Sequence, residues 1–184
     1  MEGFGNYSVF ENDSYLQAAM KHMPGGSLIM GVDLMPIWPI RGAFSLQEDI
    51  TTPNCKASIR KLMKVNDCNM LDVVLHDGLP NVGGAWVQES TTQAFLVVVA
   101  LRLAIEFLAP KGIFVSKVFR SQDYNVLLYC FKQFEKVEVT KPVASRSISA
   151  EIHVVGLRYK APAKIDPRLL DVKHLFQEVV EPPK

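Results

Sequence analysis

The sequence lacks the patterns that mark a disulfide framework or a zinc site. Its 184 residues include three cysteines, Cys55, Cys68 and Cys130, which lie far apart and form no Cys-x-x-Cys pair. The four histidines also lack the spacing of metal ligands. An odd number of dispersed cysteines argues against a disulfide-rich secreted protein and favours a reducing compartment. We therefore expect neither a structural disulfide nor a bound metal.

No membrane-spanning or secretory segment is visible in the sequence. The N-terminus lacks a basic region followed by an apolar one, which is the pattern of a signal peptide. The longest apolar stretch, residues 94–109, is interrupted by Arg102 and Glu106 and is too short and too charged to span a bilayer. We expect this stretch to form a buried helix, and we expect no membrane partner.

A glycine-rich phosphate loop is also missing. No Gly-x-Gly-x-x-Gly follows a predicted strand, and no Walker A sequence occurs. These absences weigh against a nicotinamide-dependent oxidoreductase and against a P-loop nucleotidase, because both classes bind phosphates through such loops.

Charge is balanced over the whole chain but unevenly distributed along it. Residues 1–110 carry 7 Lys and Arg against 11 Asp and Glu, whereas residues 111–184 carry 13 against 8. The later excess of basic residues suits a phosphate-contacting face, and it suits an ordinary solvated surface equally well. Charge alone therefore names no partner.

Strand and helix patterns alternate along the chain. We predict strands at residues 7–10, 27–33, 43–46, 71–77, 113–119, 136–140 and 150–157. Helices are predicted at residues 13–23, 53–64, 86–108, 123–134 and 171–180. Thr51 or Thr52 would cap the second helix, with Pro53 at its first position. The alternation predicts an α/β fold with a doubly wound, mostly parallel sheet. We expect one domain over residues 1–184, with a C-terminal tail at 162–184.

Three acidic residues, Asp33, Asp49 and Asp77, each follow a predicted strand. The carboxyl ends of parallel strands lie along one edge of a sheet, where ligands bind. An acid at this position can accept hydrogen bonds from a ribose, or it can simply cap a turn, and both readings stay open for each residue. Three such acids in succession favour a nucleoside pocket.

Two charged residues interrupt apolar strands later in the chain. Lys117 lies in Ile-Phe-Val-Ser-Lys-Val-Phe, where it needs a carboxylate or an opening to a pocket because burying an unpaired ammonium is costly. It would act as a base beside a cleft, or lie at a frayed strand end. Glu151 would pair with Lys117, or face outward on an edge strand. We predict a cluster of Asp77, Lys117 and Glu151 that is suited to removing a proton from a hydroxyl group.

Several stretches, in this order, resemble the FtsJ-like ribose 2′-O-methyltransferases. They read Gly-Val-Asp-Leu-Met-Pro-Ile (31–37), Gln-Glu-Asp-Ile-Thr-Thr (47–52), Val-Leu-His-Asp-Gly-Leu-Pro-Asn-Val-Gly (74–83), Lys-Val-Phe-Arg-Ser-Gln-Asp-Tyr (117–124), Lys-Pro-Val-Ala-Ser-Arg-Ser (141–147) and Ser-Ala-Glu-Ile (149–152). Asp-Pro-Arg-Leu-Leu-Asp (166–171) is typical of the eukaryotic nucleolar, Spb-type branch, which methylates precursor ribosomal RNA. The resemblance runs from about Leu16 to the C-terminus.

The resemblance implies a Rossmann-like methyltransferase sheet and S-adenosylmethionine as the cofactor. It also implies ribosomal RNA or its precursor as the substrate, pre-ribosomal assembly proteins as further partners, and a location in the nucleus and nucleolus. The catalytic tetrad of this family would place its aspartate on Asp77, its second lysine on Lys117 and its glutamate on Glu151. Lys117 would then accept the proton of the target 2′-hydroxyl.

The same resemblance assigns the binding residues. Asp33 would bind the cofactor ribose and Asp49 would lie beside the adenine. Asp77 and Tyr15 would line the methionine end of the cofactor. The implied RNA-contacting residues are Arg120, Lys141 and Arg146.

The beginning of the chain departs from the family pattern. The first tetrad lysine belongs to a helix upstream of the sheet that this chain starts too late to contain. The first strand and its glycine-rich loop are degenerate, because residues 7–15 place Asp13 and Ser14 where the family has glycines and Tyr15 where it has tryptophan. Asp13 would repel the cofactor carboxylate. We therefore expect a truncated or replaced N-terminus at residues 1–15. One alternative stays open: an inactive methyltransferase-like fold that binds RNA or ribosome-assembly proteins.

Overall fold

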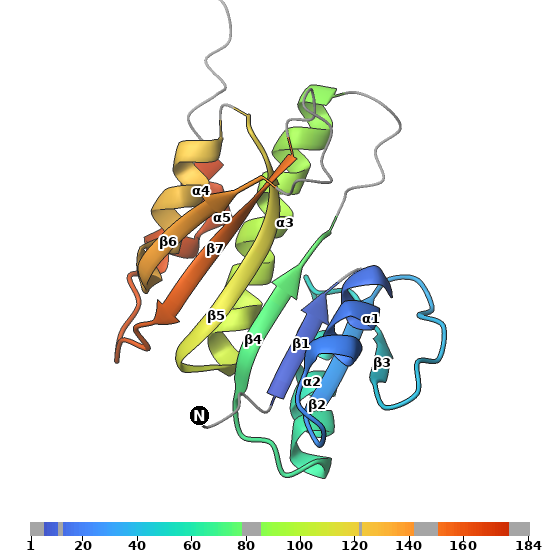
Figure 1. The fold of residues 1–184 in the computed structure, drawn as a ribbon. Coiled ribbons are helices and arrows are strands. Elements are labelled where there is room, and N and C mark those ends of the chain that lie inside the picture. The colour runs from blue at the N-terminus through green and yellow to red at the C-terminus, as the bar shows by residue number, and fades with distance from the viewer. Residues whose placement is uncertain (1–5, 11–12, 79–85, 122, 142–150, 177–184) are drawn as a thin grey trace, which may run out of the picture.

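The computed structural model describes residues 6–10, 13–78, 86–121, 123–141 and 151–176. Seven strands in these ranges form a sheet in the order β3-β2-β1-β4-β5-β7-β6 (Figure 1). The strands are β1 Asn6–Phe10, β2 Leu28–Asp33, β3 Phe44–Gln47, β4 Leu71–His76, β5 Leu108–Phe119, β6 Phe134–Thr140 and β7 Glu151–Tyr159. The helices are α1 Asp13–His22, α2 Pro53–Val65, α3 Trp86–Phe107, α4 Tyr124–Cys130 and α5 Val172–Phe176, with 3₁₀ turns at Phe131–Gln133 and Pro167–Leu170.

Five neighbouring strands, from β3 to β5, run parallel, and β7 runs antiparallel to both β5 and β6. This arrangement confirms the predicted doubly wound, mostly parallel sheet. The divergent first strand still forms at the centre of the sheet, where Tyr7 pairs with Ile29 of β2 and Val73 of β4. The sequence differences near the N-terminus therefore do not remove β1 from the fold.

The helices form unequal layers on the two faces of the sheet (Figure 1). Along β2, Leu28, Met30 and Val32 enter the larger core with α2 and α3, whereas Ile29 packs on the opposite face against Leu16 of α1. This follows from the alternation of side chains along a strand. Helices α2 and α3 lie behind the sheet in Figure 1, and α1 lies in front of it. No described helix has the length and apolar character needed to cross a membrane.

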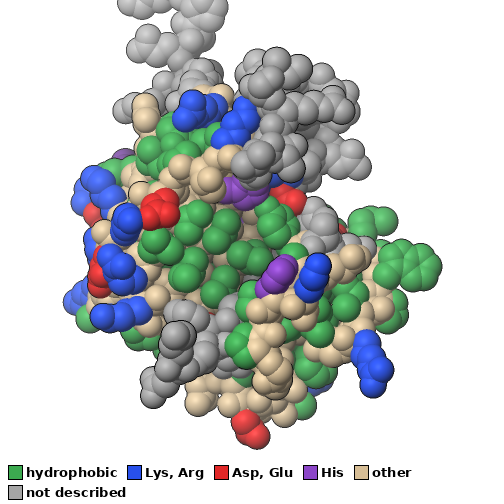
Figure 2. All heavy atoms as spheres, viewed as in Figure 1, with side chains coloured by type: hydrophobic (Ala, Val, Ile, Leu, Met, Phe, Trp, Pro, Cys, Tyr) green, Lys and Arg blue, Asp and Glu red, His purple; other side chains and the backbone are tan. Residues whose placement is uncertain are grey.

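The front face carries apolar side chains beyond the area that α1 covers. Figure 2 shows hydrophobic side chains gathered in the middle of this face, over β4, β5 and β7. Strand residues with this orientation are half-buried: Ile113, Val115, Val155 and Leu157, together with Val73 and Leu75, which also pack against the α1 cluster. Their exposure leaves the front of the sheet accessible near Lys117.

Element boundaries differ from the predictions around β5. The helix predicted at 86–108 ends at Phe107, and β5 begins immediately at Leu108 rather than at residue 113. The turn predicted at Lys111 and Gly112 is instead an irregularity within the strand. Lys111 has a φ of 66°, and the pairing with β4 shifts between Leu71 and Val73. The long strand therefore includes a kink that sequence reasoning interpreted as its start.

The last elements also differ from the predictions. The helix predicted at 123–134 ends at Cys130 and continues as the 3₁₀ turn Phe131–Gln133. Strand β6 begins at Phe134 rather than 136, because the Phe134 ring packs against Tyr159 at a centroid distance of 5.6 Å and pairs with it in the sheet. Strand β7 correspondingly extends to Tyr159 rather than ending at residue 157.

Candidate active site

The carboxyl edge of the parallel strands brings most of the predicted site residues together. Asp33 is the last residue of β2, and Asp77 directly follows β4. Lys117 lies near the end of β5, and the antiparallel strand β7 begins at the same edge with Glu151. Helix α1, which carries Tyr15 in its first turn, starts after β1 at this edge. Topology therefore assembles residues that are more than 130 positions apart in the chain.

Lys117 forms an ion pair with Asp77, from Nζ to Oδ1, with side chains only 12% and 9% exposed. The two residues meet because β4 and β5 pair up to His76 and Ser116, so the next position on each strand carries one member of the pair. A charge this poorly hydrated needs a partner. Asp77 thus supplies the carboxylate that the sequence required for Lys117.

Gln93 of α3 holds the backbone of β5 at Lys117. Its Nε2 donates to the Lys117 carbonyl at 3.2 Å, and its Oε1 accepts from the Phe119 N–H at 2.9 Å. Ser116 Oγ also donates to the Lys117 carbonyl, at 3.1 Å. The pairing of β4 with β5 ends at His76 and Ser116, and the Gln93 amide bonds to backbone groups of β5 beyond that point. Sequence analysis missed Gln93. The sequence feature that could have identified Gln93 is a single amide side chain at the start of an apolar helical stretch.

A second polar contact lies beneath the ion pair. His76, which is 1% exposed, has its Nδ1 2.9 Å from Ser116 Oγ. Burial, aided by the nearby Lys117 charge, lowers the pKa of His76 to about 3, so the imidazole is neutral at physiological pH. Its Nε2 is buried and has no hydrogen-bond partner among the described residues. The neutral His76 side chain therefore supports the end of β5, which carries Lys117, without adding a charge there.

Tyr15 and His153 meet on the same side of the sheet as Lys117. Tyr15 Oη lies 2.6 Å from His153 Nε2, and His153 pairs directly with Lys117 across β5 and β7. Burial, followed by the charges of Asp77 and Glu151, raises the pKa of Tyr15 to about 12. Burial lowers the pKa of His153 despite those carboxylates. Sequence analysis assigned Tyr15 only to the cofactor and did not select His153, whose signal is a polar ring in an apolar strand near Glu151.

Glu151 lies opposite Phe119 and is half-buried. Because residues 151 and 153 are two positions apart on one strand, their side chains face the same side of the sheet as Lys117. The charge of Glu151 acts on Tyr15 and His153. The predicted direct pairing of Glu151 with Lys117 stays a prediction.

Asp33 and Asp49 both act as turn caps. Asp33 Oδ1 accepts from the Met35 N–H at 2.8 Å. Asp49 Oδ1 accepts from the N–H and the hydroxyl of Thr51, at 2.8 and 2.7 Å. The structure therefore shows both acids capping turns, which is one of the two roles that the sequence left open for them. Capping does not compete with ligand binding, because a carboxylate has two oxygens and accepts several hydrogen bonds.

Two of the predicted RNA-contacting residues lie at the same edge. Arg120 directly follows β5, Lys141 directly follows β6, and both are exposed. Strands β5 and β6 run in the same direction because each is antiparallel to β7, so their ends lie on one side. Arg146 lies outside the described residues.

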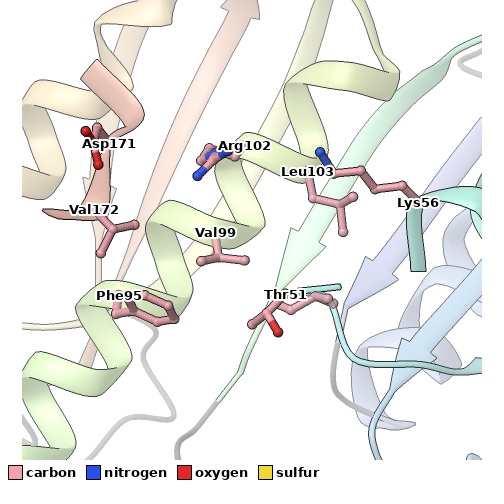
Figure 3. Close-up of a pocket in the computed structure, with 9 residues that line it drawn as sticks. Thr51, Lys56, Phe95, Val99, Arg102, Leu103, Asp171 and Val172 are labelled. Atoms are coloured by element: carbon pink, nitrogen blue, oxygen red, sulfur yellow. The ribbon is translucent and has the colours of Figure 1, made fainter. Parts of the chain in front are cut away.

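A cavity of about 330 Å³ lies on the side of the sheet that α2 and α3 cover, and its lining includes Thr51, which is hydrogen-bonded to Asp49. Figure 3 shows Phe95, Val99 and Arg102 of α3 on one wall, with Lys56 of α2 and Val172 of α5 on the others. None of the predicted catalytic or cofactor residues lines it. Within the described part of the chain, no group of three or more His, Cys, Asp or Glu side chains is placed to hold a metal ion.

The pattern of the FtsJ-like methyltransferase family matches residues 13–159. The AdoMet-dependent rRNA methyltransferase spb1 of Schizosaccharomyces pombe is 54% identical over 169 residues, which cover 91% of this chain and 21% of that protein. The 27S pre-rRNA (guanosine(2922)-2′-O)-methyltransferase of Saccharomyces cerevisiae is 52% identical over 167 residues, which cover 90% of this chain and 20% of that protein. The chain thus spans about a fifth of the length of these relatives.

Solved structures show the same fold. A ribosomal RNA methyltransferase from Plasmodium falciparum superposes with a TM-score of 0.70 at 18% identity, covering 86% of this chain and 88% of that one. Human methyltransferase-like protein 13, solved in complex with SAH, superposes with a TM-score of 0.58 at 16% identity, covering 99% of this chain and 84% of the other. At these identities the similarity concerns the arrangement of strands and helices.

Proposed function

Because the chain belongs to the FtsJ-like methyltransferase family, we propose that it methylates the 2′-hydroxyl of a ribose in ribosomal RNA or its precursor, using S-adenosylmethionine. The observation that carries this proposal is the poorly exposed Lys117–Asp77 pair at the carboxyl edge of the sheet. The names of the yeast relatives support an rRNA substrate and an S-adenosylmethionine cofactor. Ligand binding at this edge is the general rule for open α/β sheets.

The residues at the strand ends fit the adenosine end of the cofactor. Asp33 ends β2 with a half-buried carboxylate, which is where such folds accept ribose hydroxyls. Asp49 follows β3 and would lie beside the adenine. Asp77 and Tyr15 would border the methionine end, close to Lys117. S-adenosylmethionine, when bound, supplies an electrophilic methyl group.

The chemistry required of the chain is the removal of one proton. Lys117 would first pass its ammonium proton to solvent and, as the free amine, would accept the proton of the 2′-hydroxyl as that oxygen takes up the methyl group. Asp77 would hold the amine at the strand end, and Gln93 would hold the backbone from which it extends. Glu151 would complete the cluster from β7, and its charge would favour the protonated amine after transfer.

The RNA would approach along the edge that carries Arg120 and Lys141. Both residues are exposed and follow strands that end on the same side as Lys117. Basic side chains of this kind contact phosphates and fix the register of a nucleic acid without reading its sequence. Arg146 would extend the same surface. We also propose that the protein acts in the nucleus and nucleolus together with pre-ribosomal assembly proteins, because one relative is named for the methylation of 27S pre-rRNA.

A second candidate function is RNA binding without methyl transfer. It is favoured by Asp13 and Ser14, which stand where the family has glycines that let the backbone approach the cofactor. Isothermal titration of the chain with S-adenosylmethionine separates the two functions. Micromolar binding supports the enzyme, whereas no heat at millimolar cofactor together with retained rRNA binding supports the second candidate.

Transfer of a radiolabelled methyl group to rRNA tests the proposed reaction. Lys117→Met keeps the length of the side chain and removes the amine, so we expect methyl transfer to be lost while cofactor binding remains. Lys61→Met is the matched control, because Lys61 lies exposed on α2, a helix of the opposite face. Nuclease digestion of the product should place the label on a ribose 2′-oxygen. A folded Lys117→Met variant that is as active as the parent chain rules out the assigned base.

A further inference from the structure

We propose that Tyr15 and His153 form a hydrogen-bonded pair that positions Lys117 for proton transfer. The proposal rests on the function proposed above and assigns a role to two residues outside the cluster of Asp77, Lys117 and Glu151. The hydrogen bond joins Tyr15 Oη to His153 Nε2 at 2.6 Å. The two rings meet edge to face, with centroids 6.4 Å apart and planes at 70°.

The pair connects two distant parts of the sheet. Helix α1 packs next to β2 through Leu16 and Ala19, which contact the region of Ile29. Strand β7 lies beyond β4 and β5 in the strand order. The bond from Tyr15 to His153 therefore ties the first turn of α1 to the strand on the far side of Lys117. Its removal would free the beginning of α1 from β7.

His153 borders Lys117 directly. The two residues pair in the antiparallel ladder of β5 and β7, where opposed Cβ atoms lie about 5 Å apart. The lysine therefore has the Asp77 carboxylate as its ion-pair partner and the imidazole of His153 as its neighbour across the ladder. A side chain that the hydrogen bond to Tyr15 holds in place at position 153 restricts the rotamers that the lysine side chain can adopt, and this restriction is the positioning effect.

The charges around the pair influence the protonation states of Tyr15 and His153. The charged groups that act on it are Asp77 after β4, Lys117 on β5 and Glu151 on β7. Because the pKa of His153 lies below its ordinary value and that of Tyr15 is raised to about 12, both rings are uncharged at neutral pH. We assign the tautomer with the imidazole proton on Nδ1, which has no hydrogen-bond partner among the described residues, so that the tyrosine hydroxyl donates to Nε2. Protonation of His153 in acid would remove the acceptor and place a second cation opposite Lys117.

Nuclear magnetic resonance tests the pair independently of catalysis. In Tyr15→Phe, the neutral imidazole loses its hydrogen bond, so the pKa of His153 should rise toward its ordinary value. The ¹³Cε signal of Lys117 should also shift, because the neighbouring ring is no longer fixed. Tyr129→Phe is the matched control, since Tyr129 is exposed on α4 and its ring lies near Lys132. It should leave both signals unchanged.

Steady-state methyl transfer tests the positioning role. Loss of one neutral hydrogen bond predicts a fall in kcat of about two- to tenfold in Tyr15→Phe. His153→Gln can accept the same hydrogen bond and should retain kcat, whereas His153→Phe should not. Glutamine does not titrate, so the contribution of His153 to the acid limb of the pH profile should be lost in His153→Gln, whereas the contribution of the base Lys117 should remain. His174→Gln is the control that should retain the profile of the parent chain, because His174 is exposed on α5.

The outcomes separate this inference from the proposed function. If the His153 titration and the Lys117 signal in Tyr15→Phe match those of the parent chain, the positioning role is overturned, whether or not the chain is active. If both signals change but the parent chain transfers no methyl group, the pair stands and the proposed function fails. In an active chain, equal losses in His153→Gln and His153→Phe overturn the role of the hydrogen bond.

Discussion

Lys117 and Asp77 form an ion pair, so the effects of replacing them on the free energy of unfolding should depend strongly on each other. Their side chains are 12% and 9% exposed. Removing one partner from a buried pair typically costs about 3–5 kcal/mol, because the other charge stays in a poorly hydrated place. We therefore expect Asp77→Asn and Lys117→Met each to lower the free energy of unfolding by about 3 kcal/mol. The double variant should lose much less than the sum, because it buries no full charge at this position.

Urea denaturation followed by circular dichroism measures this coupling. With a slope of about 2 kcal/mol per molar urea, a loss of about 3 kcal/mol moves the midpoint by about 1.5 M. A cycle on Arg158 and Glu135, whose paired side chains are 52% and 43% exposed, is the control and should show less than about 1 kcal/mol of coupling. Additive losses at Asp77 and Lys117, within about 0.5 kcal/mol, would refute the view that burial makes this pair interdependent.

Two further substitutions distinguish a residue that supports the active site from a residue that contributes only to the stability of the fold. Gln93→Leu should cost about 1–3 kcal/mol, because it leaves the Lys117 carbonyl and the Phe119 N–H without their bonds to Gln93. It should also lower kcat for methyl transfer. Gly156→Ala should cost a similar amount, about 1–3 kcal/mol, because its Cβ would lie 2.6 Å from the Phe134 ring, but kcat per folded molecule should stay unchanged. Denaturation and single-temperature kinetics on both variants check this contrast, and equal effects on kcat would contradict it.

Much of the fold could be predicted because local patterns and tertiary packing agree. The apolar run of β2 and the cap of α2 are examples. Thr52 accepts from the Cys55 N–H at 3.3 Å, and Pro53 occupies the first helical position, as predicted. The errors lie where packing overrides local signals. Lys111 and Gly112 read as a turn but lie within β5, and Phe134 reads as the end of a helix but begins β6 because its ring joins an aromatic cluster.

The same distinction holds for the site. Periodicity placed acids at strand ends, and the expected need of Lys117 for a carboxylate follows from the cost of burying an ammonium in an apolar strand. Gln93 and His153 could not be selected from the sequence. The role of Gln93 depends on the backbone groups of β5 that lie beyond its pairing with β4, and the role of His153 depends on the pairing of β7 with β5. Neither of these is encoded in local spacing.

The sequence by itself determined the class of fold and the residue types that meet at the carboxyl edge of the sheet, which is the proposed binding edge. Hydrophobic alternation and the costs of burying charge act locally, so they can be read from the chain. The sequence predicted that Asp77 clusters with Lys117, but only the tertiary structure decided that the two form an ion pair and that Tyr15 reaches His153. Strand order and register bring these residues together, and both depend on packing across the whole sheet.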